Sequence, residues 1–451
     1  MKIKNNYDVV VVGGGPGGVC AAAAAAAQGA STLLIERYGF LGGMATAGLV
    51  NPFMAYKNGG QPLTTSCFNS ILSSLRKYNA LCSQGQIFDD EVLKIVLDKM
   101  MSDAGVDVLL HSVLCGTDIK IERTVTPRLC GYGGADNGET CKGSHSDQRI
   151  NNIEALTKGG LVQIGAKIFI DATGDGDLAY LSGAQYETGR KHDSACQPMT
   201  LCFKISGVSG DLSANDLGLE LTEILLWAKT KNLITQPRED VLVFGTLTPG
   251  TYHFNSTRIL SKKGTCSFDL TDAEIEGRRQ AFELMELFQK YSPLFKKAGI
   301  IKLACQIGIR ETRRIGGLYK ITEEDILEGR KFDDGIARSC YPVDIHNPDG
   351  SGTVLKHLEE NQYYEIPLRS LIAKDFRNLL IGSRCICSTH EAHSSLRVMP
   401  VVAGIGEAAG LTAAAAVSGQ MEDVREVDRH RIRDTIFDVT PHAVFDACIR
   451  P

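Results

Sequence analysis

The chain has 451 residues, which is long enough to bury a large core and to form two or three domains. Its formal net charge of −5 gives no electrostatic reason to expect nucleic acid or an anionic membrane surface as a partner. No apolar run reaches the length of a membrane span, and residues 1–10 lack the apolar stretch of a signal peptide, so we expect a cytoplasmic protein.

Residues 7–37 have the pattern of a strand, a glycine-rich turn, a helix and a second strand. The apolar run at residues 9–12 predicts the first strand, and residues 32–35 predict the second one. Between them lies a stretch of alanines, which favours a helix. This order is typical of a βαβ unit.

The turn of this unit has the glycine spacing of a dinucleotide-binding motif. Gly13 permits the tight turn, Gly15 lets the backbone approach a pyrophosphate, and Gly18 lets the helix pack against the strand. The free N–H groups at the start of the helix favour the negative charge of a phosphate. Glu36 ends the second strand and is placed to accept from a ribose hydroxyl. The unit therefore predicts a bound dinucleotide.

Two further segments complete the first part of the chain. Residues 40–53 are glycine-rich and almost uncharged, so they need a core or a flat apolar ligand beside them. Residues 88–104 predict a helix that starts at Asp89 and Asp90 and is closed by Gly105. A parallel strand is expected directly after this helix.

The polar residues 127–149 predict an exposed loop or hairpin excursion. Cys130, Cys141 and His145 within it fit no common metal-site spacing, and the whole chain has 14 cysteines but no C-x-x-C. We therefore expect reduced thiols and no metal or iron–sulfur centre.

A β-hairpin over residues 150–167 is expected to lead into a buried strand and a second glycine and acid turn, ATGDGD at residues 172–177. Asp175 in this turn is placed to accept from a polyol hydroxyl such as one of a ribityl chain. The alternative is a tight strand-to-helix turn with solvated acids.

From residue 186 to residue 376 the composition changes to mixed strands, amphipathic helices and longer connections, with one helix predicted over residues 272–291. The early character then returns in NLLIGSRCICS and in an alanine- and glycine-rich helix after Met399 and Pro400. We predict a discontinuous nucleotide domain (1–185 and 377–425), an inserted domain (186–376) and a C-terminal helical tail (426–451).

The helix after Pro400 offers a second ligand contact. Gly404, Gly406 and Gly410 leave its surface bare for close packing. Its N-terminus, aimed at the pyrimidine edge of a flavin, would stabilise the anion that builds there on reduction. The alternative is a plain packing helix.

Taken together, these motifs resemble the FAD-dependent oxidoreductase family of bacterial flavoproteins, a branch of the glutathione-reductase-type flavin fold with looser similarity to fumarate reductase flavoprotein subunits. Besides DVVVVGGGPGGVCAA and IDATGDGDLA, the resemblance rests on ERYGFLGGMATAG, GIRETRRIGGLYKITEEDI, YPVDIH and NLLIGSRCICSTHEAHSSLRVMPVVAGIGEAAG. It implies an α/β fold: a Rossmann-like FAD-binding domain with a parallel sheet, plus an inserted α+β substrate or cap domain.

The resemblance also implies where FAD lies, with its adenine end over the first glycine turn. The implied cofactor contacts are Gly13, Gly15, Pro16, Gly17, Gly18, Glu36, Arg37, Gly42, Gly43, Met44, Thr46, Ala172, Thr173, Gly174, Asp175, Arg384, Met399, Pro400 and Glu407. Covalent relatives use a histidine in the loop after the second strand, whereas this chain has no histidine before His111. We therefore expect non-covalent FAD.

Two segments supply the candidate catalytic residues. THEAHSSLRVMP contains His390, His393 and Arg397, and we expect the two histidines on a strand, where only one would face the flavin; we prefer His390. GIRETRRIGG contains Arg310 and Arg314, which would clamp a carboxylate or donate a proton.

The alternatives for these segments are structural. Arg313 and Arg314 would then hold Glu311 or other acids. Tyr341, Asp344 and His346 form a third group near a turn, with a structural role or a substrate contact equally open.

The expected activity is that of an FAD-dependent oxidoreductase, with hydride transfer between a small molecule and flavin N5. The arginines favour an anionic substrate such as a carboxylate or sugar acid, and the lack of a Cys-x-x-x-x-Cys after the first unit disfavours a disulfide reductase. Two alternatives stay open: a non-catalytic FAD-binding protein, and an NAD-dependent enzyme that uses only the first βαβ unit. The electron acceptor and the oligomeric state are not determined by these residues.

Overall fold

A mixed β-sheet forms the centre of the computed structural model, which describes residues 3–121, 147–210, 212–350 and 352–437. The strands of this main sheet follow the order β5-β2-β1-β8-β7-β6, and β19 pairs with β8 as well. Their bounds are β1 (Asn6–Val12), β2 (Thr32–Ile35), β5 (Asp107–Leu109), β6 (Val113–Ile121), β7 (Gln148–Thr157), β8 (Gly160–Asp171) and β19 (Leu379–Ile381).

The main sheet has a parallel half and an antiparallel half. β1 pairs in parallel with β2 and β8, β2 with β5, and β8 with β19. β6, β7 and β8 form antiparallel pairs, so the expected hairpin over residues 150–167 is confirmed. The predicted α/β class with a parallel sheet is therefore correct.

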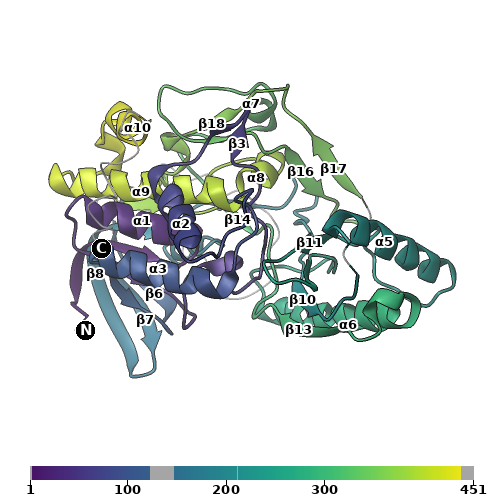
Figure 1. The fold of residues 1–451 in the computed structure, drawn as a ribbon. Helices are drawn as coiled ribbons and strands as arrows, with labels where there is room; N and C mark the ends of the chain where they lie inside the picture. Colours follow the sequence, from purple (N-terminus) through teal and green to yellow (C-terminus); the bar gives the residue numbers. More distant parts are fainter. Residues whose placement is uncertain (1–2, 122–146, 211, 351, 438–451) are drawn as a thin grey trace.

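Helices α1 (Pro16–Ala27) and α9 (Met399–Ser418) lie side by side on the main sheet (Figure 1). Their backbones touch, because a Cβ added to Gly406 would lie 1.9 Å from the carbonyl oxygen of Gly17. A Cβ on Gly410 would lie 2.2 Å from the carbonyl oxygen of Ala21. Small residues on both helices thus bring the first and last parts of the described chain into direct contact.

α9 is the one helix of the described residues that is long and apolar enough to cross a membrane. However, 83% of its most apolar window is buried inside the protein, against α1 and the sheet. A core helix passes the same length and composition test, so α9 is weak evidence for a span.

Two further helices, α2 (Ser66–Lys77) and α3 (Asp90–Ala104), pack against α1 and against each other. The carboxylate of Asp89 caps α3 by accepting from the N–H groups of Glu91 and Val92 at 2.8 and 3.0 Å. Gly105 ends the helix with a left-handed φ of 71°. The predicted start and end of this helix are therefore confirmed.

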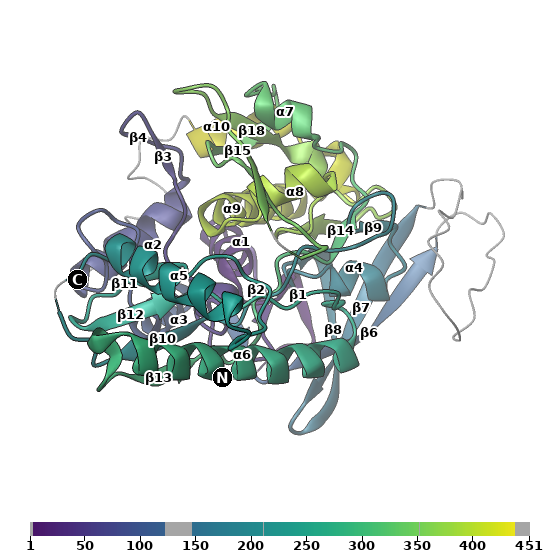
Figure 2. The same cartoon turned by 90° about the vertical axis from the view of Figure 1, so that its right-hand side faces the viewer.

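A second, smaller sheet has the strand order β11-β12-β10-β13 and lies beside α5 and α6 (Figure 2). The bounds are β10 (Phe203–Ser206), β11 (Val243–Gly245), β12 (Thr251–Phe254), β13 (Gly299–Leu303), α5 (Ala214–Thr230) and α6 (Ser267–Tyr291). Phe203 stacks on Phe254 with ring centroids 5.1 Å apart, and Phe288 packs beside them. These rings form a core of their own.

The remaining elements of the described chain are short. They are β3 (Lys57–Asn58), β4 (Gln61–Pro62), β9 (Tyr186–Thr188), β14 (Arg313–Ile315), β15 (Gly335–Ser339), β16 (Val343–His346), β17 (Thr353–Lys356), β18 (Tyr364–Pro367), α4 (Asp177–Leu181), α7 (Glu323–Leu327), α8 (His390–Leu396) and α10 (Arg429–Phe437). Four 3₁₀ turns of the described chain are η1 (Gly43–Ala45), η2 (Pro293–Phe295), η3 (Leu368–Ser370) and η4 (Val424–Glu426).

The buried apolar side chains of the described residues form three clusters, which divide at positions other than the predicted domain boundaries. The smaller core takes its residues from between Phe203 and Ala298, a third cluster includes Leu201 and Ile307, and Ile315, Ile336 and Phe376 pack into the core of the main sheet. The predicted division at residues 186 and 376 stays a prediction, and this distribution favours a narrower insertion. Most of the excursion at 127–149, with Cys130, Cys141 and His145, and the tail beyond residue 437 lie outside the described residues.

Asp90 joins α3 to the smaller sheet. Its carboxylate is buried and forms ion pairs with Lys204 on β10 and Lys302 on β13. Burial raises the pKa of Asp90, but hydrogen bonds and charges from the two lysines outweigh burial and hold the pKa below its ordinary value of 3.8. A lowered folded-state pKa means that the ion pairs stabilise the protein above the unfolded pKa and are lost as the pH falls through the folded one.

We expect Asp90→Asn to lower the free energy of unfolding at pH 7 by about 2–3 kcal/mol, because the ammonium group of Lys204 loses its counter-charge and that of Lys302 keeps only the more exposed Glu91. The difference from the wild type should start to shrink below about pH 4, the unfolded pKa of an aspartate, and should vanish once the pH falls below the lower folded-state pKa. Urea denaturation at both pH values measures it. Asp103→Asn, which breaks the surface pair with Lys99, is the control, and an equal loss in both variants would contradict a special role for Asp90.

Candidate functional site

The first glycine turn is tightly packed everywhere except at Gly15. A Cβ on Gly13, which has a φ of 102°, would lie 2.4 Å from the oxygen of Ala172. A Cβ on Gly18 would lie 1.8 Å from the oxygen of Gly13. At Gly15 the nearest atom is 3.9 Å away, on Gly43. Gly15, where the sequence predicts a pyrophosphate, is thus the one glycine among these three at which a Cβ would make only an ordinary van der Waals contact.

Pro16 and Gly17 begin α1, and no side chain caps this helix or places a carboxylate in its first turn. Its free N–H groups are therefore available to an anion.

Glu36 is buried at the end of β2, with 6% of its surface exposed. One carboxylate oxygen accepts from the N–H of Gly14 at 2.6 Å and the other from the N–H of Tyr38 at 2.9 Å. Each oxygen keeps a second lone pair, so the predicted ribose contact is compatible with this arrangement. Arg37 is exposed; its guanidinium lies 4.9 Å from the ring centre of Tyr38 and contacts Gln306.

The loop after β2 lies directly against the first turn. A Cβ on Gly43 would be 2.8 Å from the Cα of Gly15, and Gly42 has a φ of 107°. The Thr46 hydroxyl donates to the carbonyl of Leu41 at 2.8 Å and fixes the loop. Gly42, Gly43, Thr46 and the half-buried Met44 are thus brought beside Gly15.

The second turn, with Ala172, Thr173 and Gly174, follows β8. The N–H of Ala172 donates to the carbonyl of Val12 at 2.8 Å, so both turns meet at the ends of neighbouring parallel strands. Asp175 is buried and accepts from Arg384 at 2.7 Å and from the Thr312 hydroxyl at 2.8 Å. The solvated acid considered from sequence is thus wrong for Asp175.

Sequence reasoning missed Asp171, the last residue of β8. Its carboxylate is fully buried and accepts from the N–H of Ala179 at 2.9 Å and from the Thr173 hydroxyl at 2.7 Å. Burial raises its pKa to about 6 despite these hydrogen bonds. An acid that closes an apolar strand was the available signal.

The start of α9 carries Met399 and Pro400 with Val398 as its N-cap, and no side chain caps it. Glu407 lies further along the helix, where its carboxylate accepts from the N–H of Cys67 at 2.8 Å and from the Ser66 hydroxyl. Glu407 therefore stabilises the start of α2. Its predicted cofactor contact gains no support from these hydrogen bonds.

His390 and His393 lie on helix α8, not on a strand as predicted. The Thr389 hydroxyl caps this helix by accepting from the N–H of Ala392 at 3.2 Å. The segment has polar residues at most positions and no clear period, so its cap was the only usable sequence signal. Because the two histidines are three residues apart, they lie on the same side of the helix.

The two rings have different surroundings. Nδ1 of His390 lies 2.9 and 2.8 Å from the two carboxylate oxygens of Glu311, whose exposed fraction is 1%. Both ring nitrogens of His393 are buried without a partner in the described chain. Burial, followed by the charges of Arg314 and Arg397, lowers the pKa of His393 well below its ordinary value. His393 is therefore neutral.

Arg314, a predicted catalytic residue, uses its donors to hold the chain together. Nε donates to the carbonyl of Ser388 at 3.0 Å, Nη2 to that of Gly189 at 2.8 Å, and Nη1 pairs with Glu311. Its neighbour Arg313 contacts Asp177 at 2.9 Å. The structural alternative considered from sequence is therefore correct for the contacts of both arginines.

Arg310 and Arg397 belong to a third cluster that sequence analysis left undecided. Asp344 accepts from the Tyr341 hydroxyl at 2.9 Å and lies 3.4 Å from Nη2 of Arg397. Burial raises the pKa of Asp344, but the hydrogen bond with His346 and the charge of Arg397 hold it well below its usual range. The YPVDIH segment thus meets both candidate arginines.

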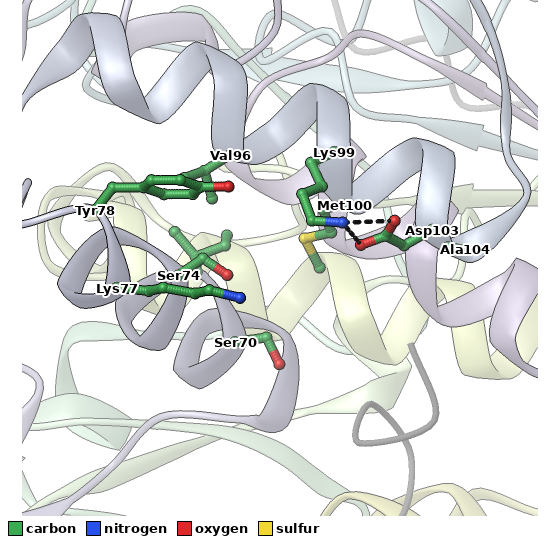
Figure 3. A pocket seen from close by; sticks show the side chains of 10 residues that line it. Ser70, Ser74, Lys77, Tyr78, Val96, Lys99, Met100, Asp103 and Ala104 are labelled. Carbon is green, nitrogen blue, oxygen red and sulfur yellow. Dashed lines mark hydrogen bonds and ion pairs between the residues drawn. The ribbon is translucent and has the colours of Figure 1, made fainter. Parts of the chain in front are cut away.

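A groove between α2 and α3 lies apart from these groups (Figure 3). Its apolar floor includes Ile71, Val96 and Met100, and Lys99 and Asp103 pair at its edge. None of its lining residues is a predicted site residue, so we do not assign the cofactor to it.

The residues present fit FAD. A Cβ at Gly15 would meet no atom closer than 3.9 Å, the starts of α1 and α9 carry uncapped N–H groups, and the main sheet places both glycine turns together. In addition, Nε of Arg384 and both nitrogens of His393 are buried without partners in the described residues. Such orphaned donors and acceptors are costly unless a ligand or water satisfies them.

Comparison with solved structures finds distant likenesses. A geranylgeranyl bacteriochlorophyll reductase-like protein from Thermoplasma acidophilum is 14% identical with a TM-score of 0.45, over 99% of this chain and 86% of that one. Anhydrotetracycline hydroxylase OxyS from Streptomyces rimosus is 10% identical with a TM-score of 0.45, over 95% and 65%. A flavin-dependent brominase is 12% identical with a TM-score of 0.44, over 95% and 83%. Likenesses at this level assign no reaction to this chain.

No curated protein matches the chain. The family model described as FAD dependent oxidoreductase, in contrast, matches residues 8–436, which is nearly the whole chain. The glutathione-reductase-type branch stays a prediction. The extent of this match shows that the chain belongs to the FAD-dependent oxidoreductase family, whose cofactor is FAD.

Proposed function

We propose that the protein oxidises or reduces a small molecule at a carbon centre, by hydride transfer to or from flavin N5, and that His390 moves the accompanying proton. The observation that carries this proposal is the buried contact between His390 and Glu311. Bound FAD would supply the hydride chemistry, and the protein would supply orientation and proton transfer.

The contact with Glu311 determines which ring nitrogen of His390 is available to accept a substrate proton. An ionised carboxylate only accepts hydrogen bonds, and Arg314 pairs with Glu311, so Nδ1 of His390 must carry the proton that faces Glu311. In the neutral ring Nε2 then has a free lone pair. It makes no hydrogen bond within the described residues, so it is available to a substrate proton.

Other residues would hold the cofactor. Glu36 would bind the adenosine ribose, the Gly15 turn the pyrophosphate, and Asp175 with Arg384 the ribityl side. We propose non-covalent binding, so denaturation should release the flavin. A cytoplasmic location and a bacterial source are also proposals, and we assign no electron acceptor.

The test is anaerobic mixing of the yellow, FAD-bound protein with a panel of metabolites while flavin absorbance is followed. For a substrate that bleaches the wild type, His390→Gln should slow bleaching by roughly 10²- to 10⁴-fold, the usual contribution of a positioned acid or base. FAD content should not change. The control is His192→Gln, whose ring is exposed and pairs only with Asp193.

Unchanged bleaching in His390→Gln would contradict the role of His390. Failure of every metabolite to bleach the wild type would instead favour the alternative of an FAD-binding protein without turnover. His393→Gln distinguishes the roles of the two histidines, since loss of FAD in that variant would place His393 at the cofactor.

A further inference from the structure

Arg310 contacts Pro198 and Thr200, and the charges of two further arginines, Arg397 and Arg238, act on its guanidinium group. Arg310 directly precedes Glu311, and Arg397 follows α8. Burial, and then the positive charges of Arg397 and Arg238, lower the pKa of Arg310 to about 9. The positive charges of Arg397 and Arg238 thus disfavour the charged form of Arg310.

Arg310 offers one free edge to a ligand. Its Nη1 donates to the carbonyl of Pro198 at 2.7 Å and to the Thr200 hydroxyl at 2.6 Å. Nε and Nη2 make no hydrogen bond within the described residues, although the side chain is only partly exposed. These two N–H groups point in parallel from the same edge of the guanidinium, which is the geometry that binds a carboxylate in a bidentate manner.

The other two arginines already have counter-charges. Arg238 pairs with Asp240 at 2.7 Å, and Arg397 with Asp344 at 3.4 Å. Arg310 has no carboxylate within ion-pair distance in the described residues. His346 beside it is neutral, because burial and the charge of Arg310 lower its pKa to about 3. The positive charge of Arg310 is therefore the one in this group that has no counter-charge among the described residues.

Further unpartnered groups lie in the same region. Nη1 of Arg238 and both polar atoms of the Gln236 side chain are buried without a hydrogen-bond partner in the described chain. Only 3% of Arg238 and 2% of Gln236 are exposed. Nε of Arg397 is also buried without a hydrogen-bond partner in the described chain. Buried donors of this kind are usually satisfied by a ligand or by water.

From this geometry we propose that the Nε and Nη2 edge of Arg310 binds a carboxylate of the substrate. The proposal rests on the proposed function and names the substrate as a monocarboxylate. A single surplus charge matches a carboxylate better than a phosphate, which carries about two negative charges.

The test uses the FAD-bound protein and small probes instead of the unknown substrate. Acetate and propionate are titrated while the flavin spectrum and the melting temperature are recorded; acetamide is the neutral isostere and inorganic phosphate the dianion. We expect the carboxylates to bind and the two comparison probes to bind much more weakly. Arg310→Gln should weaken carboxylate binding by roughly 10- to 100-fold, because a charge-assisted bidentate contact is lost.

Arg278→Gln, which removes an exposed arginine of α6, is the matched control and should bind acetate like the wild type. Arg310→Lys keeps the charge but loses the planar fork, so its affinity should lie between those of the wild type and Arg310→Gln. If Arg310→Gln fails to fold, Arg310→Lys and the comparison of acetate with acetamide on the wild type decide the question.

Equal binding of acetate and acetamide, tighter binding of phosphate, or unchanged acetate affinity in the Arg310 variants would overturn the inference. Its failure is distinct from that of the proposed function. Carboxylate binding through Arg310 without any metabolite that bleaches the flavin would contradict only the function. A bleaching substrate without an anionic group, equally active on Arg310→Gln, would contradict only the carboxylate site.

Discussion

Glu311→Gln is expected to lower the free energy of unfolding by about 3–5 kcal/mol, the usual cost of removing one partner from a buried ion pair. Glu311 and Arg314 are both almost fully buried, and the carboxylate also accepts from the N–H of Gln197 at 3.2 Å. The substitution removes the buried partner of the Arg314 charge and leaves only the exposed Glu187, whose carboxylate is 3.9 Å away. Urea denaturation followed by circular dichroism measures the loss.

The control for this variant is Glu283→Gln, which breaks an exposed pair with Arg279 on α6 and should cost less than about 1 kcal/mol. Glu311→Gln combined with Arg314→Met should recover part of the lost stability, because no uncompensated charge remains. A loss below about 1 kcal/mol in the single variant would show that the pair is solvated.

The same substitution also tests the proposed proton transfer. A glutamine can present either its oxygen or its amide N–H to Nδ1 of His390, so the ring is no longer held in one tautomer. In conditions where the variant is folded, flavin bleaching should slow by at least about 10²-fold, as in His390→Gln. Wild-type bleaching rates in folded Glu311→Gln would mean that the pair is only structural.

The second large effect is expected at the contact of α1 with α9. Gly406→Ala places a methyl group 1.9 Å from the carbonyl oxygen of Gly17, so the two helices must move apart. Overpacking of this kind costs about 1–3 kcal/mol or more. Because α1 carries the Gly15 turn, we also expect the purified variant to lose most of its FAD.

Absorbance at the flavin and protein bands gives the FAD content, and denaturation gives the stability. Gly299→Ala is the matched control, since a Cβ there meets nothing within 4 Å. A Gly406→Ala protein with full FAD content and wild-type stability would show that the two helices are not in close contact in solution.

Helices and strands whose sequence patterns lie within the element itself could be predicted from the sequence. β2 has the predicted bounds, α3 starts at its Asp89 cap and ends at Gly105, and β7 and β8 form the expected hairpin. In each case the apolar period, the cap or the turn residues lie within the element itself. The α8 segment was predicted wrongly, because it is short, polar and without a clear period.

Contacts between segments that are far apart in the sequence could not be predicted, because no local pattern encodes them. Glu311 was named as one acid that an arginine would hold, but its contact with His390, 79 positions away, was not predicted. Asp344 meets Arg397 through the packing of β16 on α8. The hydrogen bonds of the Glu407 carboxylate to the start of α2 were not predicted either, and its contact with the cofactor stays a prediction.

The amino-acid order by itself determined the first βαβ unit, the second glycine turn and the family, because a nucleotide-binding backbone needs glycine and small residues at fixed local spacings. Only the tertiary structure decided which histidine has an acid partner, which arginine of the described residues has no carboxylate beside it, and which carboxylate accepts hydrogen bonds from the start of a helix. Those assignments depend on which side chains are buried together, and burial arises when segments far apart in the chain pack against each other.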